Sequence, residues 1–289
     1  MEVLILVAAL AVGLAFALGF PKWRLTRVLA RPMPAPWRAI MLRNIPIYGR
    51  MSGELQHQLD KRVQQFLFQK KFVGCAGLEV DDDMRLTIAG QACLLLLNRS
   101  SRVYPELHTV LVYPSAFMVP RKHVDEAGVV TQARQDLLGE SWGDGRVILA
   151  WDHVKGGAAD WTDGQNVVLH EFAHQLDSES GSNNGAPYLG SETNYRNWSE
   201  VLSRDFANLC TDALYRQHSV MDHYGATSPA EFFAVATETF FEKPWQMAQR
   251  HSALFAELFK YYRVDPRAWL PQPVPDVEAQ DGEGYGHWQ

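Results

Sequence analysis

One pattern constrains this chain more than any other feature, the sequence His-Glu-x-x-His at residues 170–174. On a helix, residues four apart lie one turn above each other on the same face. His170 and His174 can therefore bind one zinc ion from the same side, and Glu171 can reach a water molecule on that ion. Five residues are weak evidence by themselves, so this interpretation depends on the sequence around them.

The flanking residues are typical of an amphipathic helix. Thr162 and Gln165 have the spacing of a capping box, which predicts the helix N-terminus at Thr162, and Gly181 suits the position just beyond its C-terminus. An apolar stripe recurs at helical spacing between them and leaves both histidines of the motif on another face. This stripe contains Val168, Leu169, Phe172, Ala173 and Leu176. The alternative is an ordinary amphipathic helix whose histidines are surface or hydrogen-bonded residues.

The composition is that of a globular protein. A chain of 289 residues, 47% of them hydrophobic, can form one good-sized domain with appendages or two small ones. A formal net charge of -6 provides no basic field, so we expect no direct binding of nucleic acid. Cys75, Cys93 and Cys210 are odd in number and form no C-x-x-C pair, which predicts free thiols in a reducing compartment.

The N-terminus resembles a membrane anchor. Residues 3–20 carry no charge and, at about 1.5 Å per residue, are just long enough to cross a bilayer core. Because the cations follow this run and do not precede it, we predict an uncleaved transmembrane helix at residues 1–20, and not a cleaved signal peptide. By the positive-inside rule the catalytic domain then lies in the cytoplasm, on a single-pass protein of the inner membrane. The cations are Lys22, Arg24, Arg27, Arg31, Arg38 and Arg43.

Three segments are expected after the anchor. Residues 21–48 are basic and interrupted by prolines, which predicts a linker that is either solvated or in contact with anionic headgroups. Residues 49–270 are expected to form the folded domain. Residues 271–289 are rich in proline, glycine and acidic residues, which predicts a disordered tail.

Periodic patterns place helices and strands within the folded domain. Strands are expected at residues 108–114 and 146–151, and both precede the motif helix. This order favours an α+β fold. Further helices are expected at about residues 52–70, 81–97, 192–217, 228–243 and 251–262.

A catalytic zinc site needs a third protein ligand and leaves one position for water. Carboxylates are the usual partners of two neutral histidines, and four lie downstream of the motif: Glu192, Glu200, Glu231 and Glu238. The last two are seven residues apart on one predicted helix, so they share one face of it.

Longer stretches resemble a known family. Residues 170–177 read HEFAHQLD, residues 224–235 read YGATSPAEFFAV, and residues 139–151 read GESWGDGRVILAW. Together they resemble the zinc peptidases related to Mlc titration factor A, and the sequence is also similar to the catalytic domain of anthrax lethal factor. The resemblance covers residues 50 to 265 and leaves out the N-terminal apolar run and the acidic tail.

The resemblance implies a zincin-like gluzincin fold that binds one zinc ion (Zn²⁺) per chain. It implies that the metal ligands are His170, His174 and Glu231. It also implies that Glu171 is the general base and that Tyr224 donates a hydrogen bond to the transition state.

Several of these residues have structural alternatives. Glu231 also completes a capping box with Ser228, and if it capped its own helix, Glu238 would be the next candidate ligand. Otherwise Glu238 is expected to support the site from behind the ligands. Asp177 could orient a ligand imidazole or be a plain residue of the last helical turn. Tyr224 could be a core aromatic residue whose hydroxyl has some other partner.

The expected reaction is hydrolysis of a peptide or protein substrate. Zinc polarises the scissile carbonyl and acidifies a water molecule, while Glu171 takes the proton and passes it to the leaving amine. The strand at residues 146–151 precedes the motif helix, and we expect an extended peptide to pair along it. The predicted substrate-binding residues on this strand are Val147, Leu149 and Trp151.

Function beyond hydrolysis follows from the resemblance. It implies a modest peptidase that acts from the amino end of peptides and binds a sugar-responsive transcriptional repressor. Another class also fits, a zincin-fold binding protein that titrates a regulator at the membrane, with hydrolysis incidental. The intact Glu171 favours an enzyme, because a scaffold has no need of a general base. A different zinc hydrolase, such as an amidase, is a third interpretation.

Overall fold

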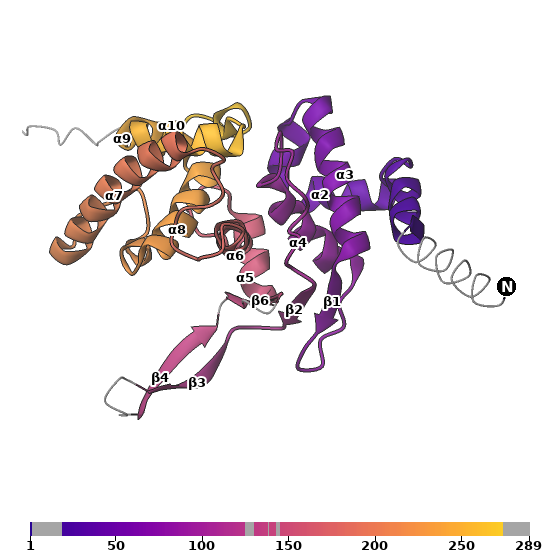
Figure 1. Ribbon diagram of the computed structural model, residues 1–289, viewed down its shortest axis with the longest axis horizontal. Coiled ribbons are helices and arrows are strands. Elements are labelled where there is room, and N and C mark those ends of the chain that lie inside the picture. The colour runs from indigo at the N-terminus through magenta and orange to yellow at the C-terminus, as the bar shows by residue number, and fades with distance from the viewer. Residues whose placement is uncertain (2–18, 125–129, 138, 143–144, 274–289) are drawn as a thin grey trace, which may run out of the picture.

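The computed structural model describes Met1 and residues 19–124, 130–137, 139–142 and 145–273 (Figure 1). Residues 19–29 are helical. The longer helices that follow are α2 (Ala35–Asn44), α3 (Gly53–Gln69), α4 (Asp82–Leu94), α5 (Trp151–Ala159), α6 (Val167–Ser178), α7 (Glu192–Tyr215), α8 (Pro229–Glu242), α9 (Pro244–Arg250) and α10 (Ser252–Tyr262). The short 3₁₀ helices are η1 (Pro46–Arg50), η2 (His223–Ala226) and η3 (Pro266–Ala268). The strands are β1 (Lys71–Gly74), β2 (Thr109–Tyr113), β3 (Phe117–Val124), β4 (Val130–Leu137), β5 (Gly139–Trp142) and β6 (Arg146–Ala150).

The main sheet has the strand order β1-β2-β6-β5. The first three strands are parallel, and β5 pairs antiparallel with β6. Parallel neighbours need a long crossover connection, which α4 contributes between β1 and β2. The remaining strands, β3 and β4, form a separate antiparallel hairpin. In Figure 1 this hairpin extends away from the helices.

The interior of the sheet is apolar. Val110 and Val112 of β2, and Val147 and Leu149 of β6, are completely buried. Branched side chains of this kind fit a pleated surface that is covered on both sides. The sheet supports the motif helix α6, which contacts both β5 and β6.

The motif helix α6 lies between two groups of helices. Figure 1 shows α2, α3 and α4 on one side of it and α7 to α10 on the other. Toward the first group, the Phe172 ring packs 5.7 Å from the Phe66 ring and 4.8 Å from the Tyr104 ring, measured between centroids. Toward the second group, α6 packs against α8. Burial on both sides fixes the helix that carries the histidines.

The expectation of an α+β fold behind a transmembrane helix is wrong. The described chain has a mixed, mainly helical fold with a small main sheet, in which three strands are parallel and the fourth is antiparallel. The two predicted strands do precede the motif helix, as β2 and β6, but helices occupy most of the described chain. Sequence patterns missed β1 because it has four residues and its side chains are only partly buried, which leaves no clear alternation.

The predicted inner-membrane protein with a single span is also wrong. None of the helices in the described residues is long and apolar enough to cross a bilayer. The apolar run behind the prediction falls mostly on residues 2–18, which lie outside the described part of the chain. The helical residues that continue it, 19–29, carry Lys22, Arg24 and Arg27, and such cations are costly within a membrane.

The predicted linker is part of the fold. Residues 35–50 form α2 and η1, and they bury Met41, Ile45, Ile47 and Tyr48 completely. These four side chains belong to the main hydrophobic core. The prolines suggested a linker, but Pro46 lies in the first turn of a helix, where the missing N–H would have no helical partner in any case. Of the predicted tail, residues 274–289 lie outside the described chain.

The motif helix begins later than the capping pattern predicts. Its N-cap is Asn166, whose side chain accepts from the main-chain N–H groups of Val168 and Leu169 at 3.1 Å. Thr162 instead lies in a turn and donates its hydroxyl to Asp160. By contrast, the predicted start of α8 is confirmed, with Ser228 as N-cap.

Candidate metal centre

Three ligand atoms converge where α6 meets α8. His170 Nε2 and His174 Nε2 lie 3.3 Å apart, as expected for residues one helical turn apart. Glu231 Oε2, from the first turn of α8, lies 2.9 Å from the first nitrogen and 3.4 Å from the second. Within the described residues, this is the one group of three His, Cys, Asp or Glu side chains that converges in this way.

These distances fit a tetrahedral zinc ion. Zinc bonds to nitrogen and oxygen of about 2.0–2.1 Å place neighbouring ligand atoms about 3.3 Å apart. The three observed separations lie close to that value, and two imidazoles with one carboxylate are a usual donor set for catalytic zinc. The residues present therefore suit the metal that the sequence predicts.

Electrostatics show that the cluster attracts a cation. Burial lowers the pKa of His170, but the Glu238 and Glu231 carboxylates outweigh it and raise that pKa well above its usual range. Burial raises the pKa of Glu231, but hydrogen bonds from His170 and His174 outweigh it and lower the pKa to about 2. The charged form of His170 is favoured between the two carboxylates, and a divalent cation bound to the cluster would be favoured by the same carboxylates.

Glu231 takes part in the cap of its helix and also faces the two histidines. The cap of α8 uses the Ser228 hydroxyl, which accepts from the main-chain N–H of Glu231 at 3.2 Å. That bond occupies the Glu231 backbone and leaves the Glu231 carboxylate directed at the two imidazoles. Of the two hydrogen bonds of a capping box, the one from the Glu231 N–H to the Ser228 hydroxyl is therefore formed. The other would use the Glu231 carboxylate and would compete with a metal.

Glu238 lies behind the ligands. Its Oε1 is 2.7 Å from His170 Nδ1, and its other oxygen accepts the main-chain N–H of Asn166. A carboxylate at Nδ1 fixes the ring orientation and turns the Nε2 lone pair toward the cluster. The seven-residue spacing from Glu231 places both carboxylates on one face of α8, on two sides of the same imidazole.

Glu171 is buried beside the cluster. It is 4% exposed, and its Oε2 has no hydrogen-bond partner among the described residues. Burial raises the pKa of this carboxyl above its ordinary value, although the two neighbouring imidazoles oppose the shift. Among the described residues, Glu171 is not one of the side chains whose candidate ligand atoms converge. A carboxyl in this position can exchange a proton without being a ligand.

Tyr224 lies at the open side of the cluster. Its ring centroid is 6.0 Å from that of His170, and the side chain is 49% exposed. It is positioned by η2, where the Asp222 side chain accepts the Tyr224 main-chain N–H at 2.7 Å. Burial, with the nearby Glu231 and Glu171 carboxylates, raises the pKa of the phenol. The hydroxyl is therefore a proton donor at neutral pH.

Asp177 contacts a loop and no imidazole. Its Oδ2 accepts the main-chain N–H of Gly185 at 2.6 Å, and Trp198 Nε1 donates to the Gly185 carbonyl at 2.8 Å. A Cβ atom on Gly185 would lie 2.3 Å from the Pro229 carbonyl oxygen. Asp177 thus holds the loop after α6 against the first residue of α8, two positions before Glu231.

The predicted substrate strand is placed differently. β6 ends at Ala150, and Trp151 already begins α5. β6 pairs with β2 on one side and β5 on the other, so its backbone has no free edge for a peptide. Val147 and Leu149 are buried in the core. The expectation that a peptide pairs along residues 146–151 is therefore wrong, because β6 is an inner strand and the outer strands of the described sheet are β1 and β5.

The sequence analysis missed Asn166 and the residues it joins. The Asn166 amide donates to Gln91 Oε1 at 2.7 Å and to Glu242 Oε1 at 2.9 Å, while its oxygen caps α6. All three side chains are buried. One residue thus joins α4, α6 and α8 directly behind His170. An Asn four residues before the first histidine is itself a capping signal, but the Thr162 pattern concealed it.

Sequence comparisons relate this chain to known proteins. The sequence profile of a family described as glucose-regulated metallo-peptidase M90 matches residues 20–263. An uncharacterized protein of Synechocystis sp. is 40% identical over 257 residues, which cover 88% of this chain and 94% of that protein.

Two relatives carry a more specific name. Mlc titration factor A of Klebsiella pneumoniae is 33% identical over 235 residues, which cover 81% of this chain and 87% of that protein. Mlc titration factor A of Cronobacter sakazakii is 32% identical with the same coverage. The chain therefore belongs to the glucose-regulated metallo-peptidase M90 family and is a relative of the Mlc titration factors.

Proposed function

We propose that this protein is a zinc-dependent peptidase whose metal is held by His170, His174 and Glu231. The convergence of their three ligand atoms at distances suited to a tetrahedral ion carries the proposal. Membership of a metallo-peptidase family supports it at a coarser level.

Glu171 is the proposed general base. Zinc held by the three ligands would supply a Lewis acid for a peptide carbonyl and acidify a water molecule. Glu171 takes a proton from the attacking water and delivers it to the leaving amine nitrogen. Burial raises the pKa of its carboxyl above the ordinary value, which favours a group that must also hold a proton before it delivers it. Its Oε2 has no competing partner in the described structure.

Tyr224 and Glu238 support the reaction in different ways. Tyr224 donates its hydroxyl proton to the carbonyl oxygen as negative charge develops there, and its raised pKa keeps that proton available. Glu238 does not touch the substrate in this proposal. It holds His170 by Nδ1, so that the ring stays correctly oriented throughout the reaction.

The substrate is proposed to bind along β5. This strand forms one end of the described sheet and contacts α6, the helix that carries the histidines. A peptide that adds to the side of β5 that pairs with no strand of the described sheet would be held by main-chain hydrogen bonds beside the metal centre. Such pairing recognises an extended backbone and does not depend on particular side chains.

Metal content and hydrolysis test this function together. We expect about one zinc per chain by mass spectrometry and cleavage of a mixed peptide library. Glu171→Gln should keep the zinc and lower turnover by about a hundredfold or more, since a general base is worth that much. A His170→Ala, His174→Ala protein with full zinc, or a Glu171→Gln protein with normal turnover, would contradict the assignment.

A second function rests on the names of the relatives. Two of them are called Mlc titration factor A, a name that points to binding of a repressor. We propose regulator binding as the alternative for this chain, with hydrolysis incidental. Pull-down of the transcriptional repressors from the source organism with the Glu171→Gln protein separates the two. Undiminished binding together with no measurable hydrolysis by the unaltered protein would favour titration.

A further inference from the structure

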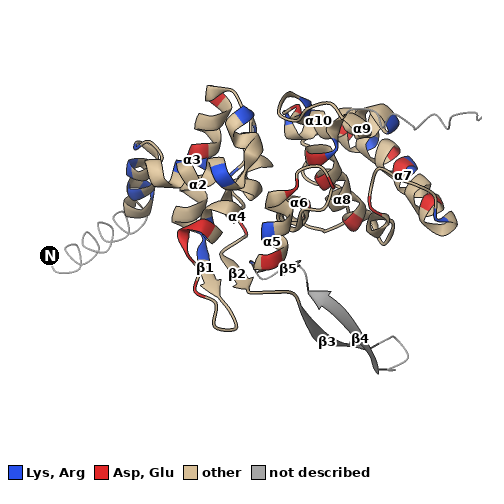
Figure 2. Cartoon of the chain, turned by 180° about the vertical axis from the view of Figure 1, so that it is seen from behind, with Lys and Arg blue, Asp and Glu red and all other residues tan. Residues whose placement is uncertain are grey.

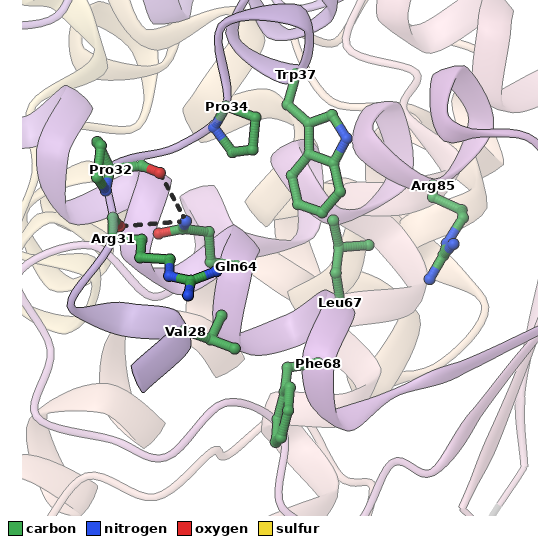
Figure 3. A pocket seen from close by; sticks show the side chains of 9 residues that line it. All are labelled: Val28, Arg31, Pro32, Pro34, Trp37, Gln64, Leu67, Phe68 and Arg85. Atoms are coloured by element: carbon green, nitrogen blue, oxygen red, sulfur yellow. Dashed lines mark hydrogen bonds between the residues drawn. The ribbon is translucent and has the colours of Figure 1, made fainter. Parts of the chain in front are cut away.

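A cavity lies apart from the metal centre, among the helices of the N-terminal half (Figure 3). Its volume is about 340 Å³, at the lower end of the range of about 300–1,000 Å³ for small-molecule sites. The walls come from α2, α3, α4, the end of the helix at residues 19–29 and the segment that follows it. No residue of the proposed peptidase site lines it. A ligand in this cavity would therefore be recognised independently of the metal.

Most of the lining is apolar and partly aromatic. Trp37, Leu67 and Phe68 are half-buried and line its central part, with Leu67 between the two aromatic side chains in Figure 3. Trp37 Nε1 donates to Asp82 Oδ2 at 3.1 Å, which holds the indole in place. Half-exposed aromatic rings around a cavity of this size favour a ligand with a compact apolar part. A flat ligand packs best against these rings.

One end of the cavity combines a cation with a buried acceptor. Figure 3 shows the Arg31 guanidinium beside Gln64, which is 4% exposed. The Gln64 amide nitrogen donates weakly to the carbonyls of Arg31 and Pro32, both at 3.4 Å. Its oxygen is buried and has no partner among the described residues. An unpaired buried acceptor costs free energy, and a ligand N–H or O–H would satisfy it.

The charge around the cavity is positive on this side. No carboxylate in the described chain pairs with the Arg31 guanidinium, and no acidic side chain lines the cavity. Lys22, Arg24 and Arg27 lie on the preceding helix, where Figure 2 shows basic residues gathered. At the other end, Arg85 is only loosely paired, with Nη1 3.7 Å from Asp82, and its buried Nε has no partner among the described residues.

We propose that this cavity binds a small aromatic anion. The anionic group, a carboxylate, phosphate or sulfonate, pairs with Arg31, and a neighbouring N–H or O–H donates to Gln64 Oε1. The flat body packs against Trp37, Leu67 and Phe68, and Arg85 attracts the ligand from the opposite end. The anionic group answers the Arg31 guanidinium, and the N–H or O–H answers the Gln64 oxygen, which has no partner among the described residues.

Anilinonaphthalene sulfonate is the probe, because it joins a sulfonate and an N–H to a flat aromatic body. Phenylnaphthylamine has the same body and N–H but no charge, so it is the matched neutral probe. Dye fluorescence and quenching of tryptophan fluorescence are titrated with the full-length folded protein. We expect one saturable site for the sulfonate and binding of the neutral dye that is weaker by about tenfold.

Variants assign the site. Arg31→Met removes the charge but keeps the length of the side chain, and it should weaken sulfonate binding by about tenfold without affecting the neutral dye. Arg31→Lys should restore most of the affinity. Arg85→Met should weaken binding by a smaller factor. Arg196→Met, an exposed arginine on α7, is the matched control and should change nothing.

Because Arg31 is exposed and no ion pair of its side chain is found among the described residues, Arg31→Met should fold normally, and a thermal melt checks this. Equal sulfonate affinity in Arg31→Met and Arg196→Met would overturn the proposal. So would equal affinity for the charged and neutral dyes, or dye binding at many sites. Chelation of any bound metal should leave the titration unchanged, so failure of the peptidase assignment does not affect this result.

Discussion

His170 and Glu238 are joined by a 2.7 Å contact between Nδ1 and Oε1, on the side of the ring opposite Glu231. The imidazole thus lies between two carboxylates that come from one helix, α8, at positions seven residues apart. One carboxylate faces the candidate metal position and the other is buried behind the ring. Their identical chemistry and different positions make them a matched pair for mutagenesis.

Glu231→Gln and Glu238→Gln should separate a ligand from a supporting residue. Glu231→Gln keeps the shape of the side chain and its Ser228 cap, so the protein should fold, yet zinc affinity should fall by orders of magnitude and turnover should vanish. Glu238→Gln should bind zinc about 10–100-fold more weakly and retain part of the activity. Competition with a chelator measures both affinities. If Glu238→Gln loses more zinc affinity than Glu231→Gln, the assignment of the third ligand is wrong.

Asn166→Ala should destabilise the metal-free protein by about 3 kcal/mol. It removes the N-cap of α6 and leaves the buried oxygens of Gln91 and Glu242 without their donor. Urea denaturation of the chelated protein gives this value without a contribution from metal binding. Asp81→Ala is the control, since it removes only the cap of α4 and should cost about 1 kcal/mol. Equal losses in both proteins would mean that the buried bonds of Asn166 contribute nothing.

Lys70 gives the fold a pH dependence far from the metal centre. The residue is 7% exposed, and its ammonium group donates to the carbonyls of Tyr104 and Leu107. Burial lowers the pKa of Lys70 to about 8. Between pH 8 and the unfolded pKa of about 10.4, the unfolded chain binds the proton that the folded chain has lost, so stability should rise with pH in this window.

The comparison with Lys70→Met isolates that effect. The variant loses two hydrogen bonds and should be less stable at all pH values, but its stability should lack the contribution that rises between pH 8 and 10. Urea midpoints at several pH values in this interval measure the difference in stability between the two proteins. Titration of the tyrosines contributes equally to both proteins and cancels in that difference. A difference between the two proteins that stays constant over the interval would show that the pKa of Lys70 is not lowered.

Local sequence signals predicted the parts of the site that lie on single helices. The four-residue spacing of His170 and His174 and the Ser228 signal at the start of α8 are confirmed, because each depends on one helical turn. The distance between the two helices could not be predicted in this way. The meeting of Glu231 with the imidazoles depends on how α6 packs against α8, and only the family resemblance supplied it.

Errors arose where burial decides the structure. The apolar run at residues 146–151 fits an edge strand or an inner strand equally well, and only pairing with both β2 and β5 shows that it is inner. The prolines and arginines of residues 21–48 indicated a linker, although Ile45, Ile47 and Tyr48 are core residues. In both segments, tertiary contacts and not the local sequence pattern decide whether the residues are buried.

The last prediction concerns Gly185, which links Asp177 to the start of α8. Gly185 and Gly190 have nearly the same positive φ, 79° and 82°, so an alanine at either position suffers the same backbone strain of about 1 kcal/mol. Their surroundings differ. A Cβ on Gly185 would lie 2.3 Å from the Pro229 carbonyl oxygen, whereas nothing lies within 4 Å of a Cβ on Gly190. Gly190→Ala therefore measures strain alone.

Gly185→Ala adds a clash that the fold can relieve only by moving the loop or the first turn of α8, which carries Glu231. We expect Gly185→Ala to lower the melting temperature more than Gly190→Ala and to weaken zinc binding by about tenfold or more, while Gly190→Ala leaves zinc affinity unchanged. Melting of the chelated proteins and chelator competition give the two readouts separately. A stability loss in Gly185→Ala with normal zinc affinity would mean that the loop yields and α8 does not. In that case the Asp177–Gly185 contact stabilises the chain without positioning the third ligand.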